Sequence, residues 1–388
     1  MNKRELELYI HIPFCIRKCA YCDFLSSAAS ERTWRDYMGK LRDEIEGQGE
    51  NFRGYRVTTI FVGGGTPSIL PAPLIEEMFA AVRRFFDVAA DAEITIEANP
   101  GTLSVDKLRT YRRCGVNRLS IGLQSADDGE LKLLGRIHTY DDFLKSYQRA
   151  RQEGFQNINI DLMSAIPGQD LHSWRSTLRR VMMLRPEHIS AYSLIIEEGT
   201  PFYEMYGNPS GRMPEVPLPD EETDRAMYHL TKEMMAAQGY ERYEISNYAR
   251  PGFACRHNIG YWIGTEYLGL GLGASSYTFG FRYRNTEDLG EYLSLNLLEG
   301  GAAAREITEL SQKDRMEEFM FLGLRRMEGV TGSDFLKRFG QNMWNIYGTV
   351  LEKLEAQGLI ATDGSRVWLT DLGVDVSNSV FCEFLLDE

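Results

Sequence analysis

The first 200 residues alternate between short apolar runs and longer amphipathic stretches, and this alternation limits the possible folds more than any other feature. Runs rich in Ile, Val and Leu are typical of strands buried on both faces of a parallel sheet, and the stretches between them have helical periodicity. Strands are predicted at residues 6–12, 57–65, 92–100, 117–125, 157–168 and 188–199. We predict an α/β fold with a partial (β/α)6 barrel. An open doubly wound sheet is the alternative, because periodicity does not separate the two.

The pattern changes beyond residue 200. A stretch rich in Pro and Gly, residues 206–220, predicts a loop or lid, followed by a helix and then a strand over 240–249. From about residue 305, helices followed by a hairpin with an Asp363-Gly364 turn indicate a smaller α+β, winged-helix-like domain. The predicted domains are the barrel over 1–220, an extension over 221–304 and the C-terminal domain over 305–388.

Charge and the start of the chain exclude some classes of protein. A net charge of −13 argues against nucleic acid as a partner, since that binding needs basic surface. The sequence has neither a secretory signal nor an apolar run of roughly 20 residues, so we expect a cytoplasmic protein. In that reducing compartment, clustered cysteines more often bind metal or do redox chemistry than form disulfides.

Three of the six cysteines lie within eight positions, as Cys15-x3-Cys19-x2-Cys22, directly after the first predicted strand. A loop can bring these thiolates to one metal centre. Three thiolates satisfy three irons of a 4Fe–4S cluster and leave the fourth iron open to an external ligand. A zinc site is the alternative. Zinc needs four protein ligands, and His11 is the candidate for the fourth.

This spacing, with the aromatic Tyr21 just before the last cysteine, resembles the signature of the radical S-adenosylmethionine superfamily. The resemblance implies that the amino and carboxylate groups of S-adenosylmethionine chelate the open iron. It also implies that an electron from the cluster cleaves the sulfonium to a 5′-deoxyadenosyl radical. The cofactors carry this chemistry, and the protein orients them and excludes solvent.

Polar residues and glycines recur at the carboxyl ends of the predicted strands, where barrels of this kind place their chemistry. The run "GGGTP" (63–67) follows the second strand, and its glycines allow backbone groups to approach a ligand closely. Glu97, Gln124 and Asp161 end the third, fourth and fifth strands, and Arg136 follows the fourth. Each alone also fits an ordinary buried polar residue. As a set they indicate one polar ligand.

Several longer motifs narrow the resemblance: "YIHIPFC", "GGGTPS", "EANP", "RLSIGLQS", "GRIHT", "NIDLMSAIPGQ" and "AYSLIIEEGTP". Together they are similar to the coproporphyrinogen oxidase-like group of the superfamily, which contains the HemN and HemW proteins. The resemblance extends into the winged C-terminal domain. The contacts that it implies for S-adenosylmethionine are Tyr9, Tyr21, Gly64, Gly65, Thr66, Glu97, Gln124, Arg136 and Asp161.

Two features favour a heme chaperone of this group over a decarboxylase. The oxygen-independent coproporphyrinogen oxidases have a further cysteine two residues after the third ligand, where this chain has Phe24, and an N-terminal extension that is missing here. The run containing His257, Asn258, Tyr261 and Trp262 resembles the HNxxYW motif of the heme chaperones. Histidine is a good axial ligand for heme iron, and aromatic side chains stack on a flat, apolar macrocycle.

Two alternatives stay open at this motif. A histidine among aromatic residues is often a hydrogen-bonded structural residue, so ligation of heme iron by His257 is a hypothesis. Cys255 is a second candidate ligand, and its alternative is a buried free thiol.

We therefore predict a heme chaperone that binds heme and passes it to an acceptor hemoprotein, and that carries a 4Fe–4S cluster with exchangeable S-adenosylmethionine. The resemblance implies membrane-associated acceptors, peripheral contact with the membrane and a homodimer that depends on the cluster. The rival is an oxygen-independent coproporphyrinogen III oxidase, which removes carbon dioxide from propionate side chains by radical chemistry. The sequence leaves open whether the protein is an enzyme, and it identifies no catalytic residue.

Overall fold

A computed structural model describes residues 3–207, 215–298 and 302–386. Its largest feature is one sheet of twelve strands, in which β1 to β6 are parallel and adjacent in chain order. These strands are β1 (Arg4–Ile12), β2 (Tyr55–Gly64), β3 (Val88–Ala98), β4 (Arg118–Gln124), β5 (Ile158–Ser164) and β6 (His188–Ser193). The six predicted strands are confirmed, although the fifth ends at Ser164 rather than at residue 168 and the sixth at Ser193 rather than at residue 199.

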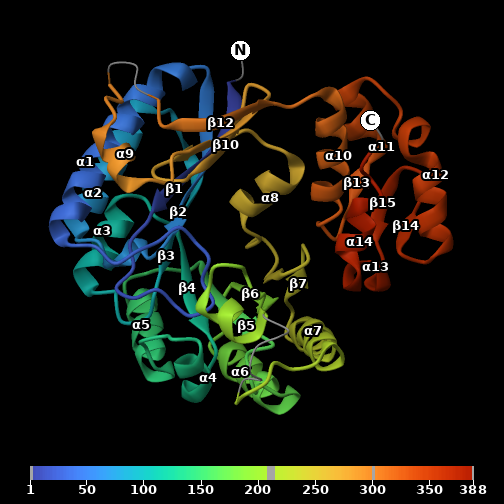
Figure 1. Ribbon diagram of the computed structural model, residues 1–388, viewed down its shortest axis with the longest axis horizontal. Coiled ribbons are helices and arrows are strands. Elements are labelled where there is room, and N and C mark those ends of the chain that lie inside the picture. The colour runs from blue at the N-terminus through green and yellow to red at the C-terminus, as the bar shows by residue number, and fades with distance from the viewer. Residues whose placement is uncertain (1–2, 208–214, 299–301, 387–388) are drawn as a thin grey trace.

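Helices cover the outer side of these strands and follow one another in chain order (Figure 1). They are α1 (Glu31–Gly49), α2 (Ala72–Phe85), α3 (Val105–Arg113), α4 (Asp128–Leu133), α5 (Tyr140–Gln152) and α6 (Leu171–Met182). Their apolar faces and the strands form one continuous core. A doubly wound sheet would place helices on both faces, so this arrangement confirms the partial barrel.

The segment predicted as an extension supplies strands to both edges of the same sheet. Beside β1 lie β9 (Tyr267–Leu270), which is parallel to it, and then β10 (Ser275–Thr278), β11 (Phe281–Asn285) and β12 (Ala304–Glu309). Beside β6 lie β8 (Asn247–Ala249) and β7 (Glu241–Arg242), both in antiparallel pairs. The single strand predicted over 240–249 is therefore wrong. Two short strands replace it, because the chain reverses between them to reach β6.

The C-terminal part has a core of its own. Three helices, α10 (Gln312–Gly323), α11 (Gly332–Phe339) and α12 (Met343–Ala356), pack on a small sheet of β13 (Val330–Thr331), β14 (Ile360–Thr362) and β15 (Arg366–Leu369). Two short helices, α13 (Asp371–Asp375) and α14 (Ser377–Cys382), complete it. This confirms the predicted winged-helix-like architecture.

Helices α7 (Glu221–Ala237) and α8 (Arg256–Ile263) contact both parts, whereas α9 (Leu289–Ser294) packs on α1 of the barrel. Helix α8 lies between the inner side of the barrel strands and α10 (Figure 1), and it contacts both β2 and α10. The predicted loop over 206–220 lies partly outside the described residues. Among the helices of the described ranges, none combines the length and hydropathy needed to cross a bilayer.

Candidate functional site

The cysteine loop follows β1, and backbone hydrogen bonds hold it against the barrel. The N–H of Cys15 donates to the carbonyl of Ser27 at 3.0 Å, and the N–H of Ala20 donates to the carbonyl of Leu134 at 3.1 Å. All three loop cysteines are free and half-buried. The loop therefore presents three thiols at the carboxyl end of the barrel strands.

Polar groups from the barrel reach two of these sulfurs. The hydroxyl of Thr66 lies 3.4 Å from Sγ of Cys15, and the guanidinium of Arg136 lies 3.6 Å from Sγ of Cys19. Burial, with the neighbouring thiols adding to it, raises the pKa of Cys22 to about 11. Three thiol ligands with hydrogen-bond donors beside them are a set that suits a 4Fe–4S cluster. The residues present fit that group.

The zinc alternative lacks its fourth ligand. Nε2 of His11 donates to the carbonyl of Leu25 at 2.9 Å, and Nδ1 lies 2.9 Å from the hydroxyl of Tyr9. Both ring nitrogens of His11 are therefore engaged. Within the described residues, no three His, Cys, Asp or Glu side chains converge as a single metal ion requires.

The glycine run at the end of β2 lies close to the backbone that leads from β1 into the cysteine loop. A Cβ on Gly65 would lie 2.7 Å from the carbonyl oxygen of Phe14, so only glycine permits this approach. The N–H of Gly64 donates to Oε2 of Glu97 at 3.1 Å. Burial first, and then the negative charge of Asp161, raise the pKa of Glu97 to about 8. A buried carboxyl of this kind favours a cationic partner such as an amino group.

Arg136 joins the fourth strand to the cysteine loop. Its guanidinium donates to the carbonyl of Gly122 at 2.5 Å and to Oδ1 of Asn99 at 2.8 Å, in addition to its contact with Cys19. Gln124 adopts a left-handed backbone with φ of 74°, and its Oε1 accepts from the hydroxyl of Tyr192 at 3.1 Å. A non-glycine residue in that conformation is uncommon and often marks a functional position.

Asp161 lies on β5, where neighbouring side chains hold its carboxylate. It accepts from Nδ2 of Asn159 at 2.7 Å and from the hydroxyl of Ser120 at 3.1 Å, and burial raises its pKa. Tyr21 packs in a small apolar cluster with Leu134 and Phe202. The structure thus gathers the predicted residues at one end of the barrel, while their contact with S-adenosylmethionine stays a prediction.

Four residues of this network were missed in the sequence. Asn99 bridges Thr66 and Arg136, with its amide donating to Oγ1 of Thr66 at 2.8 Å. It stands in the quoted "EANP" motif two residues after Glu97, so strand alternation could have placed it near the same site. The three others, which support Gln124 or Asp161, are Ser120, Asn159 and Tyr192.

Helix α8, which carries the HNxxYW motif, begins against a carboxylate of the barrel. Glu93 on β3 accepts the backbone N–H groups of Arg256 and His257, each at 3.1 Å, and Sγ of Cys255 lies 3.4 Å from it. A carboxylate at a helix N-terminus satisfies free amides and opposes the helix dipole. Cys255 is fully buried here, which matches the free-thiol alternative rather than a heme ligand.

The imidazole of His257 is enclosed by the barrel. Only 1% of the residue is exposed, Nδ1 lies 2.7 Å from Oγ1 of Thr59, and Nε2 lies 2.9 Å from the hydroxyl of Tyr261. The ring also stacks on Phe61. Burial lowers the pKa of His257 to about 3, so the ring is neutral. These contacts match the structural alternative, and a heme iron could reach this imidazole only if they broke.

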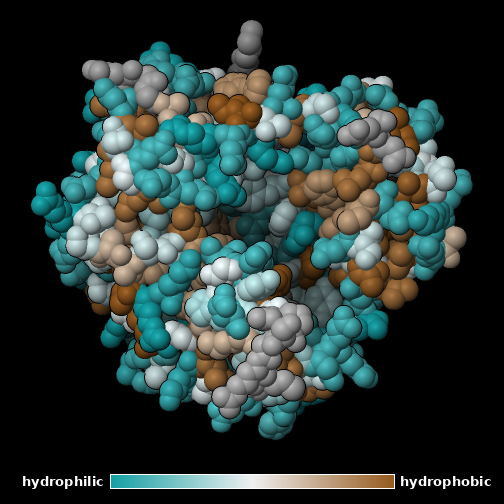
Figure 2. Space-filling model, in the orientation of Figure 1, coloured by the Kyte–Doolittle hydropathy of each residue, from teal (hydrophilic) through white to brown (hydrophobic). Residues whose placement is uncertain are grey.

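A cavity of about 800 Å³ opens between the cysteine loop, the β9–β11 edge, α8 and α10. The space-filling view is hollowed between the barrel and the C-terminal part (Figure 2). Tyr261 and Trp262 of the motif line this cavity, and so does Phe24, of which 63% is exposed. Asn258 is half-buried on the same helix. The motif therefore meets the cavity through its two aromatic residues.

The fold and this cysteine loop define a radical S-adenosylmethionine protein. Residues 9–181 match the family model described as the radical SAM superfamily, and residues 310–376 match the HemN C-terminal domain. The solved structure of coproporphyrinogen III oxidase (HemN) from Escherichia coli superposes with a TM-score of 0.86 over 99% of this chain and 90% of that chain. At 24% identity, that likeness establishes the fold alone.

Curated relatives narrow the class further. The chain is 37% identical to the heme chaperone HemW of Lactococcus lactis, over 100% of this chain and 99% of the relative. It is also 37% identical to HemW of Bacillus subtilis, over 97% of this chain and 98% of the relative. The chain belongs to the HemW family. Membership implies a 4Fe–4S cluster and S-adenosylmethionine as cofactors.

Proposed function

We propose that this protein is a heme chaperone, which binds heme and transfers it to an acceptor hemoprotein. The observation that carries the proposal is the position of the HNxxYW helix. It presents Tyr261 and Trp262 to a cavity that also borders the cysteine loop. Aromatic walls suit a flat macrocycle, and the full-length similarity to proteins named heme chaperones supports the same function.

The 4Fe–4S cluster is proposed to bind Cys15, Cys19 and Cys22, and S-adenosylmethionine is proposed to bind beside it. When bound, this pair supplies one-electron reductive chemistry. The residues of the chain provide its setting: Glu97 offers a buried carboxyl for an amino group, and Arg136 places a cation next to Cys19.

The rival function is decarboxylation of coproporphyrinogen III. HemN, whose fold this chain shares, is named for that reaction, but Phe24 occupies the position where the decarboxylases have their further cysteine. In this structure Phe24 is exposed into the cavity, where an apolar ring extends the aromatic wall. That placement suits heme binding better than proton or electron transfer by a thiol.

Ligation of heme iron by His257 is not needed for this function. Its two ring nitrogens are hydrogen-bonded to the hydroxyls of Thr59 and Tyr261. We therefore assign His257 a positioning role, in which it fixes the hydroxyl of Tyr261 at the wall of the cavity. A membrane-associated acceptor, peripheral membrane contact, a cluster-dependent dimer and a cytoplasmic location remain parts of the proposal.

A heme titration tests the proposal. Anaerobically prepared, cluster-loaded protein is titrated with hemin, and the Soret band is followed. We expect saturable binding near one heme per chain with a shifted Soret band. Absence of saturable binding would refute the chaperone function and leave coproporphyrinogen turnover as the next assay.

A further inference from the structure

The cavity beside α8 is lined by aromatic residues from five helices and strands and from the cysteine loop, an arrangement that suits a large flat ligand. Its volume, about 800 Å³, lies within the roughly 300–1,000 Å³ range of small-molecule pockets. The aromatic residues that line it are Tyr9, Phe24, Tyr261, Trp262, Tyr267, Tyr277 and Phe319. Apolar rings on several sides suit the faces of a porphyrin, but they do not explain the charges of the same cavity.

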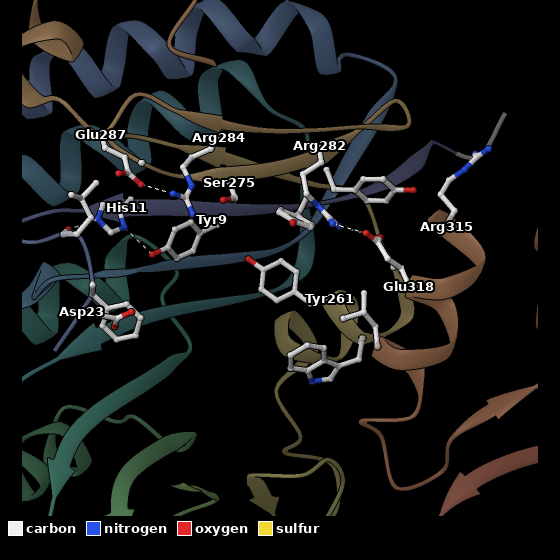
Figure 3. A pocket seen from close by; sticks show the side chains of 18 of the residues that line it. Tyr9, His11, Asp23, Tyr261, Ser275, Arg282, Arg284, Glu287, Arg315 and Glu318 are labelled. Atoms are coloured by element: carbon white, nitrogen blue, oxygen red, sulfur yellow. Dashed lines mark hydrogen bonds and ion pairs between the residues drawn. The ribbon is translucent and has the colours of Figure 1, made fainter. Parts of the chain in front are cut away.

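Two arginines of β11 face the cavity from the same side of the strand. Arg282 and Arg284 both line it (Figure 3) and are two residues apart, so strand alternation places their side chains on one face. Their partners in the antiparallel register, Tyr277 and Ser275 of β10, line the cavity as well. Both guanidinium groups therefore face the aromatic cavity from one strand, on either side of Ser275 (Figure 3).

Each of these arginines already binds a carboxylate of the chain. Arg282 makes a forked pair with Glu318 of α10, at 2.5 and 3.1 Å, and Arg284 pairs with Glu287 at 2.5 Å (Figure 3). About half of the Arg284 and Glu287 side chains is exposed, at 50% and 54%. Exposed pairs contribute little stability, so an incoming carboxylate can displace Glu287 readily.

The other lining arginine with several contacts is committed to the backbone. Arg338 donates to the carbonyls of Ile263 and Gly264, at 2.8 and 3.0 Å, and so closes the C-terminal end of α8. Lys18 of the cysteine loop and Arg315 of α10 line the cavity as well. Arg282 and Arg284 differ from them in that both project from one face of the same strand.

From this arrangement we infer that the cavity is the heme seat, with the macrocycle between the aromatic walls and its two propionates on Arg282 and Arg284. The inference rests on the proposed heme binding and adds the location and the carboxylate-recognising residues. A heme has apolar faces and two carboxylates on one edge, which matches the aromatic walls and the paired guanidinium groups. Glu287 and Glu318 then act as internal competitors that occupy the arginines until heme arrives.

The test compares hemin with hemin dimethyl ester, which lacks the propionate charges, on the cluster-loaded protein. Arg284→Gln is expected to weaken hemin binding roughly three- to five-fold, and Arg282→Gln with Arg284→Gln roughly ten-fold or more. Glu287→Gln is expected to tighten hemin binding roughly two- to three-fold, because it removes the competing carboxylate. None of these changes should alter binding of the ester by more than about two-fold.

Matched controls come from Arg53 and Glu50, another exposed pair three residues apart that does not line the cavity. Arg53→Gln and Glu50→Gln change the net charge equally and should leave hemin affinity unchanged. Suppose that hemin binds, but the cavity variants change the affinities for hemin and for its ester alike, or Glu287→Gln does not raise the affinity for hemin. The proposed location of the heme is then wrong, while the chaperone function stands. If wild-type protein binds no hemin, the proposed function itself fails.

Discussion

The carboxylate of Glu93 accepts the backbone N–H of His257 at 3.1 Å, and through this bond a strand of the barrel fixes the first turn of α8. The two residues are 164 positions apart. Because α8 carries Tyr261 and Trp262 to the cavity, the contact links the stability of the barrel to the shape of the proposed heme seat.

Glu93→Ala should destabilise the protein and loosen α8. Two backbone amides at the start of α8, one of them buried, lose their acceptor, and Arg118 loses a nearby negative charge. We therefore expect a loss of about 2–4 kcal/mol in the free energy of unfolding. Glu93→Gln keeps an acceptor oxygen and should lose less. Denaturant unfolding gives the stabilities, and hydrogen exchange reports on α8. Equal stability of the alanine variant and wild type would contradict this function of Glu93.

The contacts of His257 predict a positioning residue rather than an iron ligand. His257→Gln retains hydrogen-bonding atoms toward Thr59 and Tyr261, so we expect the heme complex to keep its Soret position. His257→Ala should lower stability by about 2–3 kcal/mol even without heme, because it leaves a cavity and unpaired hydroxyls. Absorption spectra and thermal unfolding are the measurements. A changed Soret band in the glutamine variant, with wild-type stability, would restore the axial-ligand hypothesis.

Replacement of Cys15, Cys19 and Cys22 by Ser should abolish the broad visible absorbance of a 4Fe–4S cluster, since the thiolates are its proposed ligands. Cys382→Ser is the control, because this cysteine is exposed and lies in the C-terminal part, so its loss should leave the cluster intact. Iron and sulfide analysis after anaerobic reconstitution completes the experiment. Full cluster content in the triple variant would overturn the ligand set.

Glu7 predicts a pH dependence of stability. Burial raises its pKa to about 9, and Oε2 has no hydrogen-bond partner in the described part of the chain. The folded state binds the proton of Glu7 more tightly than the unfolded state does. The resulting stabilisation is complete below the unfolded pKa near 4.5, and it is lost as pH rises through about 9. From pH 6 to pH 8, the free energy of unfolding of wild type should therefore fall by about 2–3 kcal/mol more than that of Glu7→Gln. Glu309→Gln, at an exposed glutamate of β12, is the matched control. Parallel stability curves for wild type and Glu7→Gln would rule this effect out.

The barrel strands and the cysteine loop were predictable because their signals are local. Each strand of β1 to β6 has its own apolar run, and the cysteines stand within one loop. The glycine-rich passage over 267–280 gave no such signal, yet it forms β9 and β10, because β9 pairs with β1 across more than 250 residues. Such pairing depends on long-range contacts that no local pattern contains.

The setting of the HNxxYW motif was hidden for the same reason. Helix α8 has eight residues, too few for a clear amphipathic period, so the sequence did not reveal that His257 points into the barrel. Gly260 shows how close that packing is. A Cβ there would lie 1.9 Å from Oε1 of Glu7, so α8 reaches β1 only with glycine at this position. The motif residues were found in the sequence, but only the structure shows that His257 is buried in the barrel while the half-buried Tyr261 and Trp262 line the cavity.

The most direct test of the central claim is a transfer experiment. Cluster-loaded protein is loaded with hemin under anaerobic conditions, separated from free hemin and mixed with an apo-hemoprotein. A parallel sample of the cluster-loaded protein receives S-adenosylmethionine, a reductant and coproporphyrinogen III. A heme chaperone passes heme to the acceptor, seen as the acceptor's own spectrum, and releases no carbon dioxide from coproporphyrinogen. Carbon dioxide release with formation of protoporphyrinogen IX, and no transfer of heme, would contradict the account.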